Sequence, residues 1–184
     1  MPIRLFAAIL LSAVLLSACA PQPAAPTTLP TLPADAPPEQ PLTLIPLTQP
    51  AASASSQFSG ADWYGQVLVL LPQYPDVFEG GPQGALMLLP AAEILACLDA
   101  ADCQPLDPQP LPLFAAGLKA AVPGFEGFEA IAFDGDSVYI TIEAHELGGM
   151  QGYIIRGQMQ PDLAGITLDV GSLTPVNPQA KLSN

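Results

Sequence analysis

The chain has 184 residues and a formal net charge of −13 at pH 7, because four lysine and arginine residues stand against 17 aspartate and glutamate residues. Affinity for a phosphate backbone comes from Lys and Arg side chains that displace counterions, so this composition excludes a nucleic-acid-binding protein. The same charge repels anionic lipid headgroups, so attachment to a membrane cannot come from the protein surface.

A short apolar segment opens the chain. Residues 5–18 are apolar or small, follow Arg4, and end in Leu16-Ser17-Ala18 before Cys19. A basic residue, a short apolar run and small residues at its end are typical of a secretory signal peptide. A membrane-spanning helix needs about 20 apolar residues, so we expect residues 1–18 to be removed and not to span a bilayer.

The four residues Leu16 to Cys19 resemble the lipobox of bacterial lipoproteins. The resemblance implies that a signal peptidase leaves Cys19 as the first residue and that fatty acyl chains such as palmitate are attached there. At about 0.8 kcal/mol per buried CH₂, two or more chains hold a protein on a membrane. The resemblance therefore implies an extracytoplasmic protein of the bacterial cell envelope, bound to the membrane through Cys19.

Residues 19–57 are rich in Pro, Ala and Thr and carry almost no charge. Proline removes backbone donors and biases a chain toward polyproline II, which opposes helices and ladders. We therefore expect a disordered tether. At about 3.1 Å per residue it would hold the folded part roughly 100 Å from the membrane when extended.

Residues 58–184 are expected to form one mainly β domain. Short apolar runs bounded by Gly, Pro or Asp predict strands. These runs cover residues 66–71, 84–89, 129–133, 138–143, 152–157 and 165–169. Two short helices are predicted, one over 90–97 with Pro90 at position N1, and one over the alanine-rich residues 114–121.

The domain repeats itself at an offset of about 70 residues. Trp63-Tyr64-Gly65-Gln66 and the apolar run that follows match Phe133-Asp134-Gly135-Asp136 and the run that begins after Ser137. Residues 84–88 match 152–156 as third strands, and residues 110–113 and 166–169 supply fourth strands. The prolines of residues 110–113 predict an edge strand. The repeat thus predicts two antiparallel four-stranded units.

Two such units suit the blades of a β-propeller, and a β-sandwich is the alternative. We favour blades, because the order of hairpin, third strand and fourth strand follows from a meander, whereas a Greek key would scramble it. A propeller closes with four to eight blades. We therefore expect an incomplete propeller, continued by further blades or completed by self-association.

The segment from Glu126 to Ala144, which contains Glu-Ala-Ile-Ala-Phe before a glycine turn, resembles blade segments of phytase-like and esterase-like β-propeller proteins. Residues 63–75 resemble a first blade of such proteins. Related propellers include those of gluconolactonases and strictosidine synthases. The resemblance implies either hydrolysis of phosphate esters or lactones, often with bound calcium, or binding without catalysis.

Acidic residues are concentrated in the second unit. Carboxylates are the ligands that calcium prefers, so Glu129, Glu143, Asp134 and Asp136 are candidate metal ligands. For Asp134 and Asp136 the alternative is a role in the turn, because they flank Gly135 and Asp suits turn geometry. In related propellers the residue corresponding to Glu129 also opens a strand.

His145 is the only histidine and shares one strand face with Glu143, since side chains alternate along a strand. It is a candidate binding residue, and the alternative is an exposed residue at a strand end. The sequence contains neither Gly-x-Ser-x-Gly nor His-Glu-x-x-His, so we assign no catalytic residue.

Cys97 and Cys103 are separated by five residues. An extracytoplasmic setting permits a disulfide between them, and the alternative is a pair of buried thiols. A zinc site would need further ligands nearby.

The sequence therefore favours an anchored lipoprotein with a binding or scaffold role. The alternative is a calcium-assisted phosphoester or ester hydrolase, in which Glu129 and Glu143 hold the metal that polarises the substrate.

Overall fold

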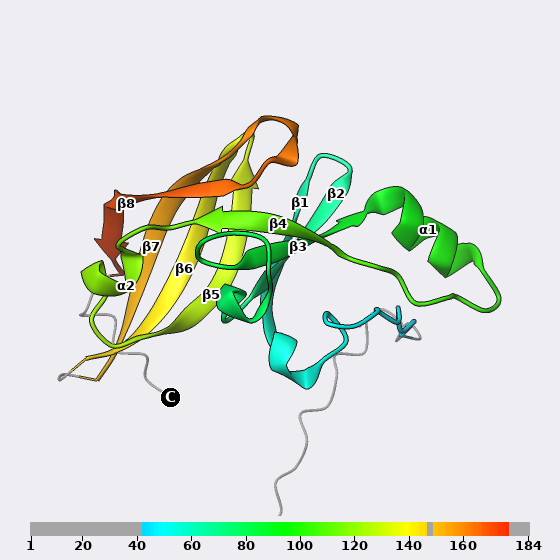
Figure 1. Ribbon diagram of the computed structural model, residues 1–184, viewed down its shortest axis with the longest axis horizontal. Coiled ribbons are helices and arrows are strands. Elements are labelled where there is room, and N and C mark those ends of the chain that lie inside the picture. The colour runs from blue at the N-terminus through cyan, green and yellow to red at the C-terminus, as the bar shows by residue number, and fades with distance from the viewer. Residues whose placement is uncertain (1–41, 147–148, 177–184) are drawn as a thin grey trace, which may run out of the picture. The chain divides into compact units, whose positions relative to one another are not determined.

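The computed structural model describes residues 42–146 and 149–176 (Figure 1). The predicted signal peptide, Cys19 and the first part of the predicted tether lie outside the described residues. Within the described ranges, no helix has the length and apolar character needed to cross a membrane.

The described part of the chain is mainly β, as predicted. Its strands are β1 Phe58–Tyr64, β2 Val67–Pro72, β3 Ala85–Pro90, β4 Gln109–Phe114, β5 Phe125–Asp134, β6 Ser137–Glu146, β7 Gly149–Met159 and β8 Ile166–Pro175. Its α-helices are α1 Ala91–Asp99 and α2 Leu118–Ala121, and single 3₁₀ turns are η1 Ala54–Ser56, η2 Pro75–Val77 and η3 Pro161–Leu163.

The two predicted four-stranded units are present. Strands β1 to β4 form one antiparallel meander and β5 to β8 form another. Each begins with a hairpin whose two-residue loop opens on glycine, Gly65 with φ +59° and Gly135 with φ +58°. Glycine adopts this left-handed conformation without steric cost, so the repeated glycine marks the repeated turn. Two such meanders are consistent with the predicted incomplete, propeller-like arrangement.

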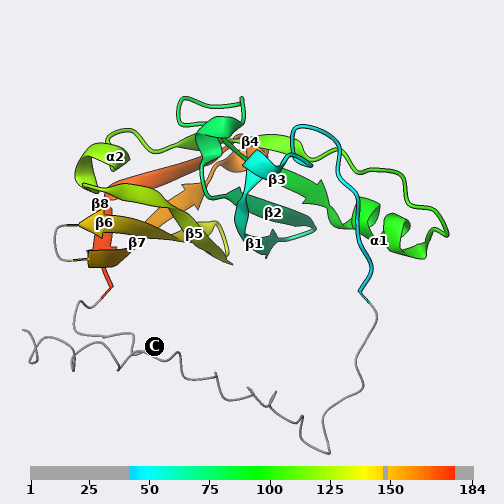
Figure 2. The same ribbon diagram turned by 90° about the horizontal axis from the view of Figure 1, so that it is seen from below.

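The two units join edge to edge. Strand β4 pairs in parallel with β8 through Leu113↔Ile166 and Phe114↔Thr167. The result is one eight-stranded sheet in the order β1-β2-β3-β4-β8-β7-β6-β5. Its outermost strands β1 and β5 lie side by side, so the sheet curls into a nearly closed, barrel-like form (Figure 1 and Figure 2).

Polar contacts hold the seam between the outermost strands. The Asp62 carboxylate accepts a hydrogen bond of 2.8 Å from the backbone N–H of Phe133. After β2, the carbonyl of Gln73 accepts one of 3.0 Å from the N–H of Phe128. At Gly60 a Cβ atom would lie 3.0 Å from the Cα of Ala130, so the missing side chain permits this close approach.

The prediction that residues 110–113 form an edge strand is wrong for the sheet order, because β4 lies between β3 and β8. Pro110 and Pro112 lie in the part of β4 that pairs with β3. Pairing with β8 begins only at Leu113. The missing proline N–H groups therefore interrupt no bond to β8.

Both predicted helices are shifted. Pro90 ends β3, where it pairs with Val67, and is the N-cap of α1 instead of its first residue. The second helix is shorter than predicted, because Phe114 continues β4 and pairs with β8. Gly117, with φ +83°, then precedes the single turn of α2.

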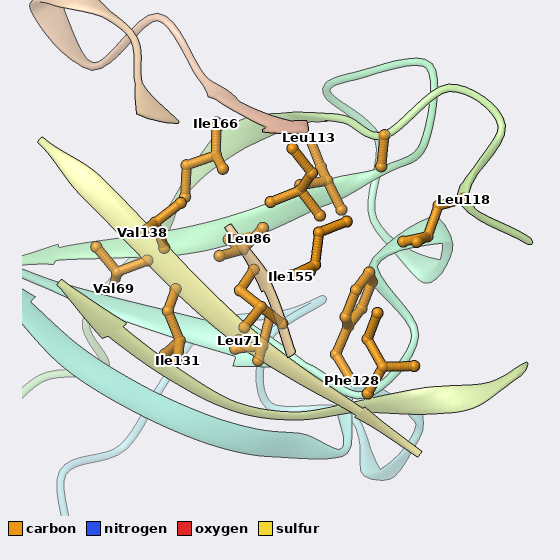
Figure 3. Close-up of a cluster of buried hydrophobic side chains, with 14 of the residues drawn as sticks. Val69, Leu71, Leu86, Leu113, Leu118, Phe128, Ile131, Val138, Ile155 and Ile166 are labelled. Carbon is orange, nitrogen blue, oxygen red and sulfur yellow. The ribbon is translucent and has the colours of Figure 1, made fainter. Parts of the chain in front are cut away.

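One hydrophobic core fills the inside of the curled sheet and takes side chains from both units (Figure 3). In β2 the inward residues are Val69 and Leu71, and in β6 they include Val138 and Ile140. The sequence match skips Ser137 and pairs Val69 with Ile140, and both are buried. Counted from the glycine turns, however, Val69 (0% exposed) stands at the position of Tyr139 (40% exposed). Positions at the same distance from the two turns thus point to opposite faces.

The parallel pairing of β4 and β8 explains this inversion. Two meanders that meet through their fourth strands, in parallel, are related by a half-turn about an axis along the strands. That rotation exchanges the two faces of a sheet. Because side chains alternate along a strand, the second unit reaches the core with the neighbouring positions of its pattern.

The described end of the predicted tether, residues 42–57, packs on the domain. Leu47 and Leu106 form a β-bridge, and the N–H of Thr48 donates to the carbonyl of Leu106 at 2.8 Å. Ser56 is buried and its hydroxyl donates to the carbonyl of Pro50 at 2.9 Å. The folded body therefore begins before Phe58.

Candidate functional site

A pocket of about 300 Å³ opens between the η2 segment and α2. It combines apolar, aromatic and charged side chains. The lining residues are Tyr74, Pro75, Asp76, Pro82, Gln83, Leu113, Ala115, Gly117, Leu118, Lys119, Ala120, Phe125 and Phe128.

The loop between β2 and β3 forms one wall of this pocket. The side-chain oxygen of Gln83 accepts a hydrogen bond of 2.7 Å from the N–H of Ala115, just after β4. The N–H of Leu113 donates to the carbonyl of Gly84 at 3.0 Å. Gly84 has φ +88° and lies tightly against the carbonyl of Pro75, which leaves no room for a side chain. The wall is thus tied to β4.

The floor of the pocket is apolar. Leu113, Leu118 and Phe128 are buried there, and all belong to the main core. Figure 3 shows Leu118 and Phe128 near each other at one end of that core. The Phe125 and Phe128 rings meet edge to face with centroids 5.3 Å apart. A ligand entering the pocket would therefore contact aromatic and aliphatic surface.

One ion pair lies at the rim. The Lys119 ammonium is 3.0 Å from Oδ2 of Asp76, and their side chains are 69% and 56% exposed. The same ammonium lies 5.7 Å from the centroid of the Phe125 ring. The rim therefore presents a carboxylate and an aromatic face to a single cation.

The structure separates the predicted metal ligands into two places. Asp134 and Asp136 flank Gly135 at the β5–β6 turn, and Asp136 accepts a hydrogen bond of 2.6 Å from the Tyr64 hydroxyl. Glu129 and Glu143 lie farther along the same strands. Among residues 42–146 and 149–176, no group of three or more His, Cys, Asp or Glu side chains could hold a metal ion.

Glu129 and Glu143 do influence each other. Partial burial raises the pKa of the Glu129 carboxyl above 4.5, and the negative charge of Glu143 raises it further. The Gln73 side-chain amide, which donates to Glu129 at 3.2 Å, opposes the shift. Glu129 lies at a bulge where the register of β5 against β6 shifts. The bulge places it beside Gln73 at the seam.

His145 is exposed near the end of β6 and pairs with Met150 of β7. Its Nδ1 lies 3.3 Å from the Met150 sulfur, and its backbone N–H donates to the carbonyl of Gly124 at 2.7 Å. The neighbouring residues Ile142 and Ala144 are buried. Glu143 and His145 therefore share the outer face of the sheet, as alternation predicts.

Cys97 and Cys103 are joined by a disulfide, with their Cα atoms 4.8 Å apart. Cys97 is buried at the end of α1. The bond closes the turn after that helix, and neither cysteine lines the pocket.

Comparisons with protein families, curated proteins and solved structures found no match for this chain. Reasoning from the sequence missed the pocket, because residues 74–83 and 113–128 meet only through the pairing of β4. The available hint is Lys119, one of four basic residues in the chain, which is followed closely by two phenylalanines.

Proposed function

We propose that the chain is a membrane-anchored extracytoplasmic lipoprotein with a binding or scaffold role, and that its binding site is the pocket between η2 and α2. The pocket carries the proposal, because an apolar interior with a few polar groups at its rim is typical of small-molecule sites. The likeness of Leu16 to Cys19 to a lipobox supports the anchor.

The lining of the pocket favours binding over catalysis. Among the described residues that line it there is no Ser, Thr, Cys or His, which are the commonest nucleophiles and general bases. Its charged side chains, Lys119 and Asp76, neutralise each other at the rim. These groups can orient a ligand, and we assign them no chemical step.

The anchor is tested by labelling cells that express the full chain with a palmitate analogue. We expect label on the wild type and membrane recovery of the protein. Cys19→Ser should lose both, whereas Cys103→Ser should keep the label. Equal labelling of the wild type and Cys19→Ser would contradict the lipid anchor.

The pocket is tested with a panel of neutral, anionic and cationic benzyl compounds, with thermal stabilisation of the full chain as the readout. Ala120 lines the pocket and Ala121 follows it on α2 without lining it. We expect Ala120→Trp to abolish stabilisation and Ala121→Trp to retain it. If no member of the panel stabilises the wild type, the proposed binding role fails.

The second candidate is the calcium-assisted hydrolase, and one observation favours it. Glu129 and Glu143 are near enough for one charge to raise the other's pKa. A calcium-dependent rise in melting temperature that Glu129→Gln removes would support this candidate. Two carboxylates fall short of the six to eight oxygen ligands that calcium takes, so we expect no such rise.

Self-association or further blades are the remaining proposals for partners. A ring completed by a second copy should give a dimer or larger mass in light scattering on the full chain in detergent. A strictly monomeric protein mass would rule out self-association.

A further inference from the structure

We propose that the pocket binds a small organic ammonium cation with an apolar body, and that Lys119 occupies the cation position until such a ligand displaces it. The inference rests on the proposed binding function and names its ligand class. It is carried by the geometry of the rim.

The Lys119 ammonium marks where a ligand's ammonium would lie. It contacts Oδ2 of Asp76 at 3.0 Å and lies 5.7 Å from the centroid of Phe125. A carboxylate supplies a charge-assisted contact, and the negative face of an aromatic ring attracts a cation within about 6 Å. Together these two groups form a recognition element for an ammonium ion.

The interior next to this position suits an apolar body. Leu118 and Phe128 are buried beneath it, and Tyr74 adds a third aromatic side chain to the lining beside Phe125 and Phe128. A volume of about 300 Å³ is at the lower end for ligand pockets. An amine that carries one aromatic ring or a short alkyl group fits this space.

The charge of the protein favours a cation over an anion. The chain carries a formal charge of −13, which concentrates cations near its surface and repels anions. At the rim, Asp76 already neutralises the Lys119 ammonium. An anionic ligand would have to separate this pair and then lie beside the freed carboxylate.

The Lys119 ammonium is readily displaced from Asp76. Both partners of the ion pair are more than half exposed, and such pairs are weak in water. Lys119 carries its charge on a flexible four-carbon stem, so the ammonium can turn to solvent while α2 stays in place. The ligand would then exchange one ammonium for another without breaking the core.

The test is isothermal titration calorimetry on the full chain with benzyltrimethylammonium, whose charge is independent of pH. Benzyl alcohol and benzoate are the neutral and anionic controls. We expect the cation to bind best and Asp76→Asn to weaken its binding roughly two- to fivefold, as expected for loss of a charge contact at an exposed rim. Phe125→Leu should also weaken binding of the cation.

Lys119→Met gives the distinctive result. Because it removes the competing ammonium, it should tighten binding of the cation roughly two- to fivefold, as the weakness of exposed ion pairs suggests. Arg156→Met is the matched control, since Arg156 forms an exposed ion pair with Asp169 at 3.5 Å outside this pocket. It makes the same change in net charge and should leave the affinity nearly unchanged.

Weaker binding of the cation to Lys119→Met, or an equal gain in Arg156→Met, would overturn the inference. Stronger binding of benzoate or benzyl alcohol that Ala120→Trp abolishes would also overturn it, while leaving the proposed binding function in place. If none of the three compounds binds the wild type, both the ligand class inferred here and the proposed binding function fail.

Discussion

The hydroxyl of Tyr64 donates a hydrogen bond of 2.6 Å to Oδ1 of Asp136. Tyr64 directly precedes Gly65 and Asp136 directly follows Gly135, so the bond joins the hairpin turns of the two units. The Tyr64 ring also lies 5.3 Å from that of Phe133. The hydrogen bond thus links the two units at the turns where their sequences are most alike, across the seam between β1 and β5.

This contact predicts a pH-dependent role for Tyr64. The hydrogen bond to Asp136, partial burial and the charge of Asp136 raise the pKa of the Tyr64 phenol above 10.0. A pKa raised by folding gives stability that is present below the unfolded value and lost as pH rises through the folded value. We expect Tyr64→Phe to melt below the wild type at pH 7, and the difference to shrink above roughly pH 10.

The control for this prediction is Tyr139→Phe, which removes a hydroxyl from the outer face of β6. Melting curves at pH 7 and at alkaline pH should show little change for this variant. If Tyr64→Phe is as stable as the wild type at pH 7, the bond contributes nothing to the seam.

The two hairpin glycines should respond alike to substitution. Gly65 and Gly135 have φ values of +59° and +58°, and nothing lies within 4 Å of an added Cβ. Only backbone strain then opposes Ala, so each Ala variant should lose about 1 kcal/mol of unfolding free energy. Asn tolerates this conformation and should cost less. Urea denaturation measures the two Ala variants and the two Asn variants. Clearly unequal losses of unfolding free energy at the two glycines would show that the turns differ in structure.

The inverted faces of the repeat predict unequal effects at equivalent positions. Leu71 is buried in the core, and Thr141, which stands at the same distance from its hairpin turn, is only partly buried. Leu71→Ala should cost about 2–5 kcal/mol through the cavity that it leaves. Thr141→Ala should cost about 0.5 kcal/mol or less.

Ile142, which follows Thr141 and is buried, is the matched test within the second unit. Ile142→Ala should resemble Leu71→Ala in urea denaturation. A large loss for Thr141→Ala together with a small loss for Ile142→Ala would show that both units use the same face.

Glu129 should lower stability at neutral pH. Because its pKa is raised on folding, the Glu129 carboxyl contributes to stability below about pH 4.5, and this contribution is lost as the pH rises through the folded pKa. Glu129→Gln stays neutral and can still accept the hydrogen bond from Gln73. We expect the variant to exceed the wild type in unfolding free energy at pH 7, by less than about 1 kcal/mol, and to equal it near pH 4. Its melting temperature should therefore be higher at pH 7 and the same near pH 4.

The control is Glu126→Gln, on the same strand, which should change the melting temperature less. A lower melting temperature for Glu129→Gln at pH 7 would mean that the carboxylate charge is stabilising there, as it would be at an occupied cation site.

The local structure of this chain follows from its sequence. Short apolar runs bounded by Gly, Pro and Asp located most strands, and the glycines at 65 and 135 fixed two matching hairpins. These features depend on neighbours in the chain, since turn geometry and side-chain alternation act over a few residues. That Glu143 and His145 share one face of a strand was predictable for the same reason.

Helix boundaries were less predictable, because tertiary pairing decided them. Pro90 suits a first helical position, yet its pairing with Val67 keeps it in β3. Phe114 belongs to an alanine-rich run, yet its pairing with Thr167 keeps it in β4. In both cases the bonds of the sheet outweighed a weak local preference.

Two similar antiparallel units and a strongly acidic composition follow from the order of the residues alone. Tertiary contacts were needed to establish that β4 meets β8 in parallel, that the second unit turns its other face inward, and that Lys119 contacts Asp76. The physical reason is that strand partners and ion pairs depend on contacts between residues far apart in the chain. A pattern with period two defines two faces of a strand, and tertiary packing determines which of them is buried in the core.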